Sequence, residues 1–189
     1  MRYVTLVERI YQLAGREHLR VEVAAGVTSA PATCAAHFAR LLHGRGILVA
    51  LGYLNERTRY RFTGLYRAEP PLLHNVALFD RENPDLDGSG AVAKLDETYC
   101  SITRLTASPF STDDAMHDAR LTTHAARDSV LCYSGVPIRL GSGLPWGTLC
   151  HFDLRPRLLP PDELAVLASA APLVAEWLAR QPSAGRPRD

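Results

Sequence analysis

The chain has 189 residues, which is a typical length for one domain. Apolar residues make up 47% of the sequence and charged residues 22%, a composition that is ordinary for a globular domain and excludes a disordered chain. Basic residues exceed acidic residues by one, so the formal net charge is +1. A balance this close to neutral argues against general binding to nucleic acid or to an anionic membrane surface.

The sequence predicts a cytoplasmic protein without a membrane span. Charged residues interrupt the N-terminal segment before the apolar core of a signal peptide forms. No apolar run approaches about 18 residues, the length that a membrane-spanning helix needs. The cysteines lie far apart and form no CxxC pair, which favours a reducing compartment. They are Cys34, Cys100, Cys132 and Cys150.

The first half of the chain is predicted to begin with helices and to continue in strands. Apolar residues recur with the helical period at both ends of the first forty residues, and the period then changes to that of strands. The expected elements are, in chain order, a helix over 1–15, a helix over 33–43, two strands within 46–67 joined at residues 55–57, a strand over 74–79 and a loop over 80–90.

The second half is predicted to alternate helices with a hairpin. Asp96 is the expected N-cap of the first helix, and Pro172 is expected to kink or divide the last one. The expected elements are a helix over 94–108, a short strand and turn over 107–115, a short helix or helical loop over 117–127, a hairpin of strands over 129–140 and 146–154, and a helix from Pro160 to about Arg180. Hairpin strands with helices gathered at the ends indicate an α+β fold with a mainly antiparallel sheet.

The stretch from Tyr133 to Arg157 resembles the GAF domain family, the small-molecule sensor module of many bacterial signalling proteins. It contains Tyr-Ser-Gly-Val-Pro-Ile, then a glycine-rich turn, then Gly-Thr-Leu-Cys-His-Phe-Asp and finally Arg-Pro-Arg. Residues 97–100 and 113–118 stand where such domains carry their pocket helix and a following polar turn. The resemblance covers residues 30–180 and is most specific over 94–157.

This resemblance implies a single GAF-like domain over residues 1–189, with a flexible tail at 181–189. The implied fold is α+β, with an antiparallel sheet of five or six strands. Terminal helices are expected on one face of that sheet, and the helices and loops that form a pocket on the other. The implied function is that of a non-catalytic sensor, which binds a small molecule of unknown class and contacts a protein signalling partner.

The resemblance also raises two chemically active relatives. Free methionine-R-sulfoxide reductases are GAF enzymes that use several cysteines around the pocket, and Cys100 lies near one of those positions. No partner cysteine is present over 86–91 or 124–128, which leaves a sulfenic acid on Cys100 without a nearby resolving thiol. A thiol-based redox enzyme or sensor that uses Cys100 is therefore the alternative function. Bilin-binding relatives anchor their chromophore through a Cys-His pair, and this chain has Thr123-His124 at that place.

Three side-chain groups each have a functional and a structural interpretation. Arg57, Arg59, Arg61 and Arg67 alternate with aromatic residues, so they either hold an anion or form a solvated outer face. The group of Asp113, Asp114, His117 and Asp118 either grips a cation or polar ligand or caps a turn. The cysteines and histidines lack the paired spacing of a zinc site, since only Cys150-His151 are close and adjacent strand residues face opposite ways. We expect no metal site and no cofactor that the sequence identifies.

The terminal helices predict a homodimer. Leu6, Ile10 and Leu13 in the first helix, with Leu167, Val174 and Leu178 in the last, exceed what one sheet face needs for cover. Members of the family often pair through these helices, and twofold pairing is the commonest symmetry of oligomers.

We expect the ligand pocket between the sheet and the helices that precede the final hairpin. Aromatic walls and a few oriented polar groups are typical of such pockets. The predicted ligand-binding residues are Tyr53, Phe62, Tyr133 and Phe152 from the sheet, Tyr99, Cys100, Thr103 and Phe110 from the helical side, and Asp113, His117 and Asp118 as polar groups. Aromatic residues that filled the cavity would instead indicate a pure interaction domain.

Overall fold

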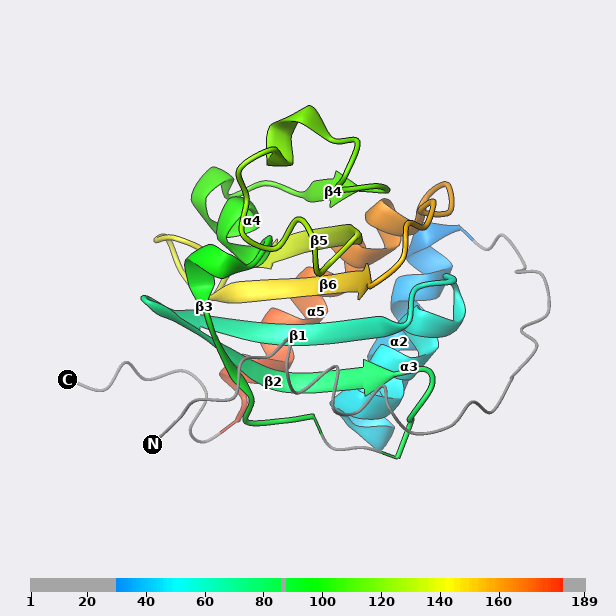
Figure 1. The fold of residues 1–189 in the computed structure, drawn as a ribbon. Coiled ribbons are helices and arrows are strands. Elements are labelled where there is room, and N and C mark those ends of the chain that lie inside the picture. Colours follow the sequence, from blue (N-terminus) through cyan, green and yellow to red (C-terminus); the bar gives the residue numbers. More distant parts are fainter. Residues whose placement is uncertain (1–29, 86–87, 182–189) are drawn as a thin grey trace.

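A six-stranded sheet forms the centre of the computed structural model, which describes residues 30–85 and 88–181 (Figure 1). The strand order is β3-β2-β1-β6-β5-β4, and each neighbouring pair is antiparallel. This confirms the predicted α+β class and the antiparallel sheet. The strands are β1 Phe62–Glu69, β2 Leu72–Asp80, β3 Val92–Lys94, β4 Phe110–Thr112, β5 Cys132–Ile138 and β6 Gly147–Asp153.

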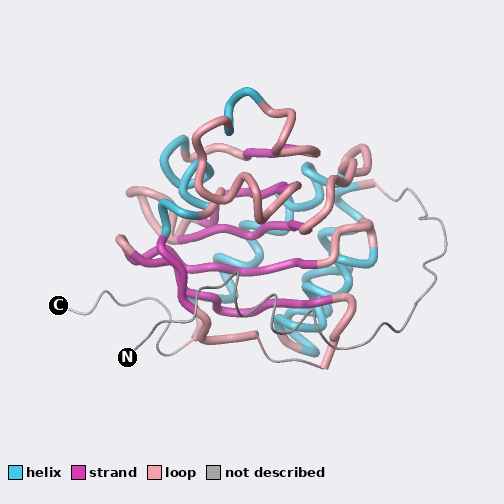
Figure 2. Tube along the Cα trace, viewed as in Figure 1, coloured by secondary structure: helices cyan, strands magenta, loops and turns pink. Residues whose placement is uncertain are grey.

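Helices cover the sheet on both faces, and the two layers have different sizes (Figures 1 and 2). The larger layer consists of α2 Pro31–Arg45, α3 Ile47–Glu56 and α5 Glu163–Ala179. The smaller layer consists of α4 Cys100–Thr106 and the short 3-10 turns η1 Leu95–Glu97 and η2 Ala119–Leu121. Each layer has its own buried apolar cluster against the sheet. No helix in the described ranges has the length and apolar character to cross a membrane.

The central strand β6 takes part in both clusters. Cys150 and Phe152 belong to the cluster beneath α4, whereas Leu149 belongs to the cluster beneath α2 and α5. This alternation follows from the period of two along a strand. The position of a residue along β6 therefore determines which of the two helical layers its side chain faces.

The segment 46–57 differs from the prediction, because it forms α3 rather than a strand. Residues 47–54 are apolar except for Gly52, and such a stretch has no period that separates a buried strand from a buried helix. In the structure Ala50, Leu51 and Leu54 are fully buried, which is the spacing of one helical face. The second predicted strand of this region is confirmed as β1, but it begins only at Phe62.

The segment 94–108 also differs in detail. It contains η1 and then α4, with Thr98 between them in an extended conformation. Tyr99 occupies the N-cap of α4, so Asp96 is not the cap. Thr98 donates both its backbone N–H and its hydroxyl to the Leu95 carbonyl, which closes the first turn early. The break turns the start of α4 toward the sheet.

The other predicted elements in the described ranges are confirmed as α2, β2, β4, η2 and the β5–β6 hairpin. The last helix is confirmed as α5, and Pro172 lies inside it without dividing it. Leu167, Val174 and Leu178 are buried within one chain against the sheet and α2, so they provide no surplus apolar surface. The predicted helix over 1–15 lies outside the described residues, as does the tail beyond residue 181.

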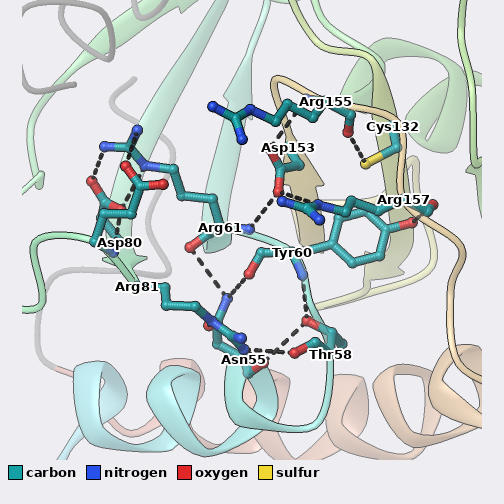
Figure 3. Close-up of polar contacts among 11 residues, drawn as sticks. Asn55, Thr58, Tyr60, Arg61, Asp80, Arg81, Cys132, Asp153, Arg155 and Arg157 are labelled. Atoms are coloured by element: carbon teal, nitrogen blue, oxygen red, sulfur yellow. Dashed lines mark hydrogen bonds and ion pairs between the residues drawn. The ribbon is translucent and has the colours of Figure 1, made fainter. Parts of the chain in front are cut away.

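The predicted arginine face does not form. The Arg57 side chain pairs with Glu163 of α5 at 2.9 Å, and Arg59 is exposed beyond the end of α3. Arg61 is 8% exposed and binds Asp80 through two nitrogens, each at 2.8 Å (Figure 3). Arg67 is half-buried and contacts Glu69 at 3.0 Å. Arg57, Arg59 and Arg61 precede β1, so the alternation of a strand does not determine the directions of their side chains.

A buried polar network closes the end of the sheet where β1 begins (Figure 3). Asp153 accepts from the Arg61 backbone N–H at 3.0 Å and from Arg157 Nε at 3.2 Å. Arg81 donates to the Asn55 side-chain oxygen at 2.9 Å and to backbone carbonyls of Asn55 and Thr58. The network joins α3 to the strand ends through side chains that are otherwise costly to bury.

Candidate functional site

A cavity of about 380 Å³ lies between the sheet and the smaller helical layer. The central strands contribute Tyr66, Tyr133, Cys150 and Phe152, and β2 and β3 contribute residues 72–73 and 92–94. The opposite wall is formed by residues 97–100 with Ala126, Ser129 and Val130. Most of the lining side chains are apolar. Lys94 and Glu97 stand at its edge, pair with each other at 2.8 Å and are largely exposed, so the cavity opens beside them.

The floor of the cavity is built around Cys150. Its two neighbours across the sheet are Gly64 on β1 and Gly135 on β5. The ring of Tyr66 lies over Gly64 and that of Tyr133 lies over Gly135, and a Cβ at either glycine would overlap the ring. Glycine at these two positions therefore lets two tyrosines lie flat beside the Cys150 thiol.

The Cys100 thiol faces this floor from the first turn of α4. It accepts hydrogen bonds from the Thr148 hydroxyl at 3.0 Å and from the Tyr133 hydroxyl at 3.6 Å. Stabilisation of its thiolate by hydrogen bonding, with Cys150 as the largest contributor and Thr148 and Tyr133 after it, lowers the pKa of Cys100 against the opposing effect of burial. Burial raises the pKa of Cys150, so a negative charge on this pair resides on Cys100.

The tyrosines supply neutral hydroxyls to the cavity. The Tyr66 hydroxyl is buried and has no hydrogen-bond partner among the described residues. Tyr99 donates to the Val130 carbonyl at 3.1 Å, and Tyr133 bonds Thr103 at 3.3 Å. Burial raises the pKa of Tyr66, Tyr99 and Tyr133, which keeps all three phenols protonated at neutral pH. A buried donor without a partner costs free energy, and a ligand acceptor placed there would recover it.

Seven of the predicted binding residues lie in or next to this cavity. Tyr99, Cys100, Tyr133 and Phe152 line it. Phe62, Thr103 and Phe110 are buried beside them. Phe62 stacks on Phe152 with 4.8 Å between ring centres, and Thr103 forms a hydrogen bond with Tyr133. The Phe110 ring lies 6.1 Å from that of Tyr99.

The predicted polar members do not reach the cavity. Asp113, His117 and Asp118 line a separate shallow depression at the surface beside β4 and η2. His117 is exposed and bonds Asp114 at 2.7 Å, and Asp118 is held by Arg120. Their sequence positions follow β4 directly, and β4 is the edge strand of the sheet, so the turn extends outward rather than over the sheet.

Tyr53 also lies elsewhere, and most of the lining residues were not predicted. Tyr53 is on α3, on the opposite face of the sheet, where it stacks on His37 at 4.6 Å. The assignment failed because it treated residues 46–57 as a strand. Tyr66 and Cys150 line the cavity but were left out of the predicted set. The period of two relates Cys150 to Phe152 and Tyr66 to Phe62, so the alternation could have identified both.

Cys150 and His151 are the one adjacent cysteine–histidine pair that the sequence analysis considered as metal ligands, and they lie on opposite faces of the sheet. Cys150 faces the cavity, whereas the His151 ring lies beneath α5, 3.6 Å from the Glu163 carboxylate, and bonds Thr63 at 2.7 Å. Within residues 30–85 and 88–181 no cluster of three or more histidine, cysteine, aspartate or glutamate side chains could hold a metal ion.

Comparisons with known proteins identify the fold. No protein-family profile and no curated protein sequence matches the chain. The GAF domain of an Acinetobacter phosphoenolpyruvate-protein phosphotransferase is 10% identical with a TM-score of 0.63, covering 81% of this chain and 95% of that one. The free methionine-R-sulfoxide reductase of Neisseria meningitidis, solved with its substrate, is 12% identical with a TM-score of 0.59, covering 82% and 95%. The type II enzyme of Thermoplasma acidophilum is 22% identical with a TM-score of 0.52, covering 76% and 96%, so the chain has the fold that GAF domains and these reductases share.

Proposed function

We propose that this protein is a non-catalytic sensor domain that binds an uncharged, largely apolar small molecule in the cavity beneath α4. The single observation that carries the proposal is the cavity of about 380 Å³ itself, which lies between the sheet and the smaller helical layer and is lined mostly by apolar side chains. About 300–1,000 Å³ is the usual size of small-molecule sites, and this cavity lies within that range.

The ligand class follows from the groups that line the cavity. Aromatic rings, those of Tyr66, Tyr99, Tyr133 and Phe152 among them, provide flat apolar walls. Lys94 and Glu97, the charged side chains at the edge, neutralise each other. A planar, largely apolar molecule therefore suits the site, whereas a charged molecule would lose hydration without a partner.

The experiment is native mass spectrometry of freshly purified protein together with its absorption spectrum. A co-purified mass identifies the ligand, and N-phenyl-1-naphthylamine, an uncharged aromatic dye, serves as a fluorescent probe of the emptied cavity. We expect Ala126→Phe to weaken probe binding at least about tenfold, because Ala126 lines the cavity and the new ring fills it. Ala125→Phe is the matched control, since Ala125 is exposed and outside the lining. Equal binding by both variants would contradict the assignment.

The proposal also covers the cellular location of the domain and the contacts through which it signals. A cytoplasmic location suits four buried cysteines that form no disulfide. Occupancy of the cavity is communicated by contacts between two copies of the chain or with a protein signalling partner. Strand β6 forms part of the cavity and also packs beneath α5, which provides a route from the ligand to the larger helical layer.

A second candidate function is thiol redox chemistry at Cys100 on a sulfoxide substrate. The observation that favours it is the Cys100 thiol, which lines the cavity and has a lowered pKa. Two of the solved structures with this fold are free methionine-R-sulfoxide reductases. The assay follows release of methionine from methionine-R-sulfoxide with dithiothreitol as the reductant. Turnover that disappears in Cys100→Ser would establish this function, and no turnover by the unaltered protein would reject it.

A further inference from the structure

We propose that Cys100 and Cys150 are the two halves of a reversible disulfide, formed by hydroperoxides, that reduces ligand binding in the cavity. The inference rests on the proposed function, because it assigns regulation to the same cavity. The two thiols come from different parts of the chain. Cys100 is the first residue of α4 and Cys150 lies in the middle of β6. A bond between them would fasten the wall of the cavity to its floor.

The geometry brings the two sulfurs together. The Thr148 hydroxyl holds the Cys100 sulfur at 3.0 Å above β6. Thr148 and Cys150 are two residues apart on the same strand, so their side chains leave the same face of the sheet. The Tyr133 hydroxyl, which also donates to the Cys100 sulfur, lies over Gly135, the residue opposite Cys150 on β5. Cys100 and Cys150 are therefore neighbours in the lining of one cavity, and disulfide formation needs a further approach of the two sulfurs to about 2 Å.

The glycines beside Cys150 keep this approach open. Gly64 and Gly135 have no side chain that could come between the two thiols, and both flank Cys150 in the sheet. The other two cysteines lie away from the pair. Cys34 belongs to the cluster beneath α2, and Cys132 donates to the Arg155 carbonyl at 3.2 Å near the sheet end.

The surroundings give the two thiols different roles. Cys100 accepts hydrogen bonds that favour its thiolate, and the thiolate is the form that attacks peroxides. Cys150 lies beneath it in an apolar setting and stays protonated. Cys100 is therefore the attacking thiol, and Cys150 is the resolving thiol. The open side of the cavity beside Lys94 and Glu97 admits a molecule as small as hydrogen peroxide.

The reaction has two steps that balance. The Cys100 thiolate attacks one peroxide oxygen, the O–O bond breaks, and Cys100 becomes a sulfenic acid while hydroxide leaves and takes a proton to form water. The Cys150 thiol then attacks the Cys100 sulfur, the S–O bond breaks, and water leaves with the Cys150 proton. Two thiols are oxidised to one disulfide, and one peroxide is reduced to two waters.

The disulfide alters the cavity directly. The two sulfurs approach to about 2 Å, which draws the start of α4 toward β6. Thr148 and Tyr133 lose the hydrogen bonds that they donate to the Cys100 sulfur as a thiolate. Because Tyr99 precedes Cys100 in the chain, the same movement displaces an aromatic wall of the cavity. Ligand affinity should therefore fall on oxidation and recover on reduction.

The test treats the whole protein with a small excess of hydrogen peroxide and follows mass and binding together. We expect the intact mass to fall by that of two hydrogen atoms, with a peptide cross-link between Cys100 and Cys150. Binding of the N-phenyl-1-naphthylamine probe should weaken about tenfold and return after dithiothreitol treatment. Cys150→Ser should instead gain one oxygen on Cys100, which dimedone traps, and form no cross-link; its probe affinity after peroxide is compared with its own affinity before treatment. Cys34→Ala and Cys132→Ala are controls that should behave as the unaltered protein does.

The outcomes separate this inference from the proposed function. A reduced protein that binds the probe but forms no Cys100–Cys150 link overturns the inference and leaves the sensor cavity intact. A link that forms without any change in probe affinity overturns the regulatory role. A link that forms in a protein whose Ala126→Phe variant binds the probe normally overturns the proposed function instead, along with the regulation that rests on it.

Discussion

At the scale of single residues, the cavity depends on two glycines, which have no side chain, as much as on the tyrosines that lie over them. Gly64 and Gly135 flank Cys150, and each lies beneath the ring of a tyrosine from its own strand. The hydroxyl of one of these tyrosines reaches Cys100, and that of the other stays free. Small changes at the glycines should therefore reposition the groups that bind the ligand.

Gly135→Ala tests this arrangement. The new methyl group would occupy the space of the Tyr133 hydroxyl, so the ring must move away from Thr103 and Cys100. We expect the free energy of unfolding to fall by about 1–3 kcal/mol, measured by urea titration, because a packed core resists added volume. Gly141→Ala is the control, since a Cβ there meets no atom within 4 Å. Equal stability of the two variants would show that Tyr133 moves freely.

The pH dependence of Cys100 alkylation tests its lowered pKa. The thiolate is the reactive form, so the rate of reaction with iodoacetamide rises as pH increases through the pKa. Hydrogen bonds from Cys150 and Thr148 lower the pKa of Cys100, so the midpoint should lie at lower pH in the folded protein than in urea. Cys150→Ala removes the first of these bonds and should move the midpoint upward. Peptide mass mapping follows Cys100 separately, and a midpoint unchanged by folding would contradict the assignment.

At the scale of elements, polar contacts decide where β1 begins. Alternating residues predicted a strand from residue 58, yet β1 starts at Phe62, after Arg61 has paired with Asp80 of β2. The preceding residues instead complete the end of α3, where the Asn55 side chain donates to the Tyr60 carbonyl at 3.0 Å. A buried network of this kind has no period in the sequence, so pattern analysis could not find it.

Asp80→Ala should destabilise the protein by about 3 kcal/mol, because it leaves the Arg61 guanidinium buried without its main partner. Urea unfolding measures the change. Arg61→Met together with Asp80→Ala should recover part of the loss, since neither charge then remains buried. Glu97→Ala is the control, because its pair with Lys94 is exposed and its loss should leave the unfolding curve unchanged. A double variant less stable than Asp80→Ala alone would contradict this explanation.

At the scale of the whole molecule, the sequence predicted the architecture better than the site. The hairpin of β5 and β6 and the glycine pattern around it established an α+β sheet, because turns and alternation are local signals. The cavity required knowing which segments face each other across the sheet. Tyr53 was misplaced because α3 was taken for a strand, and Asp113, His117 and Asp118 were misplaced because β4 is an edge strand.

The homodimer, which concerns the whole molecule, remains a prediction. Since Leu167, Val174 and Leu178 are buried within one chain, its basis is the apolar stripe of residues 1–15, which lies outside the described residues. We expect sedimentation equilibrium at tens of micromolar (roughly where weak dimers form) to give twice the mass of the chain. Removal of residues 1–15 should give a monomer. A monomer for the complete sequence at that concentration would reject the prediction.

The pairing of β1 with β6 has a consequence for how the chain folds during synthesis. These strands lie side by side at the centre of the sheet, although Phe62 pairs with Phe152, 90 positions later. Until β6 has been made, β1 can pair only with β2 and presents an open edge that invites association between nascent chains. Contacts this far apart in sequence also slow the search for the native state. Folding of the core is thus a late event, completed only when almost the whole described chain is available.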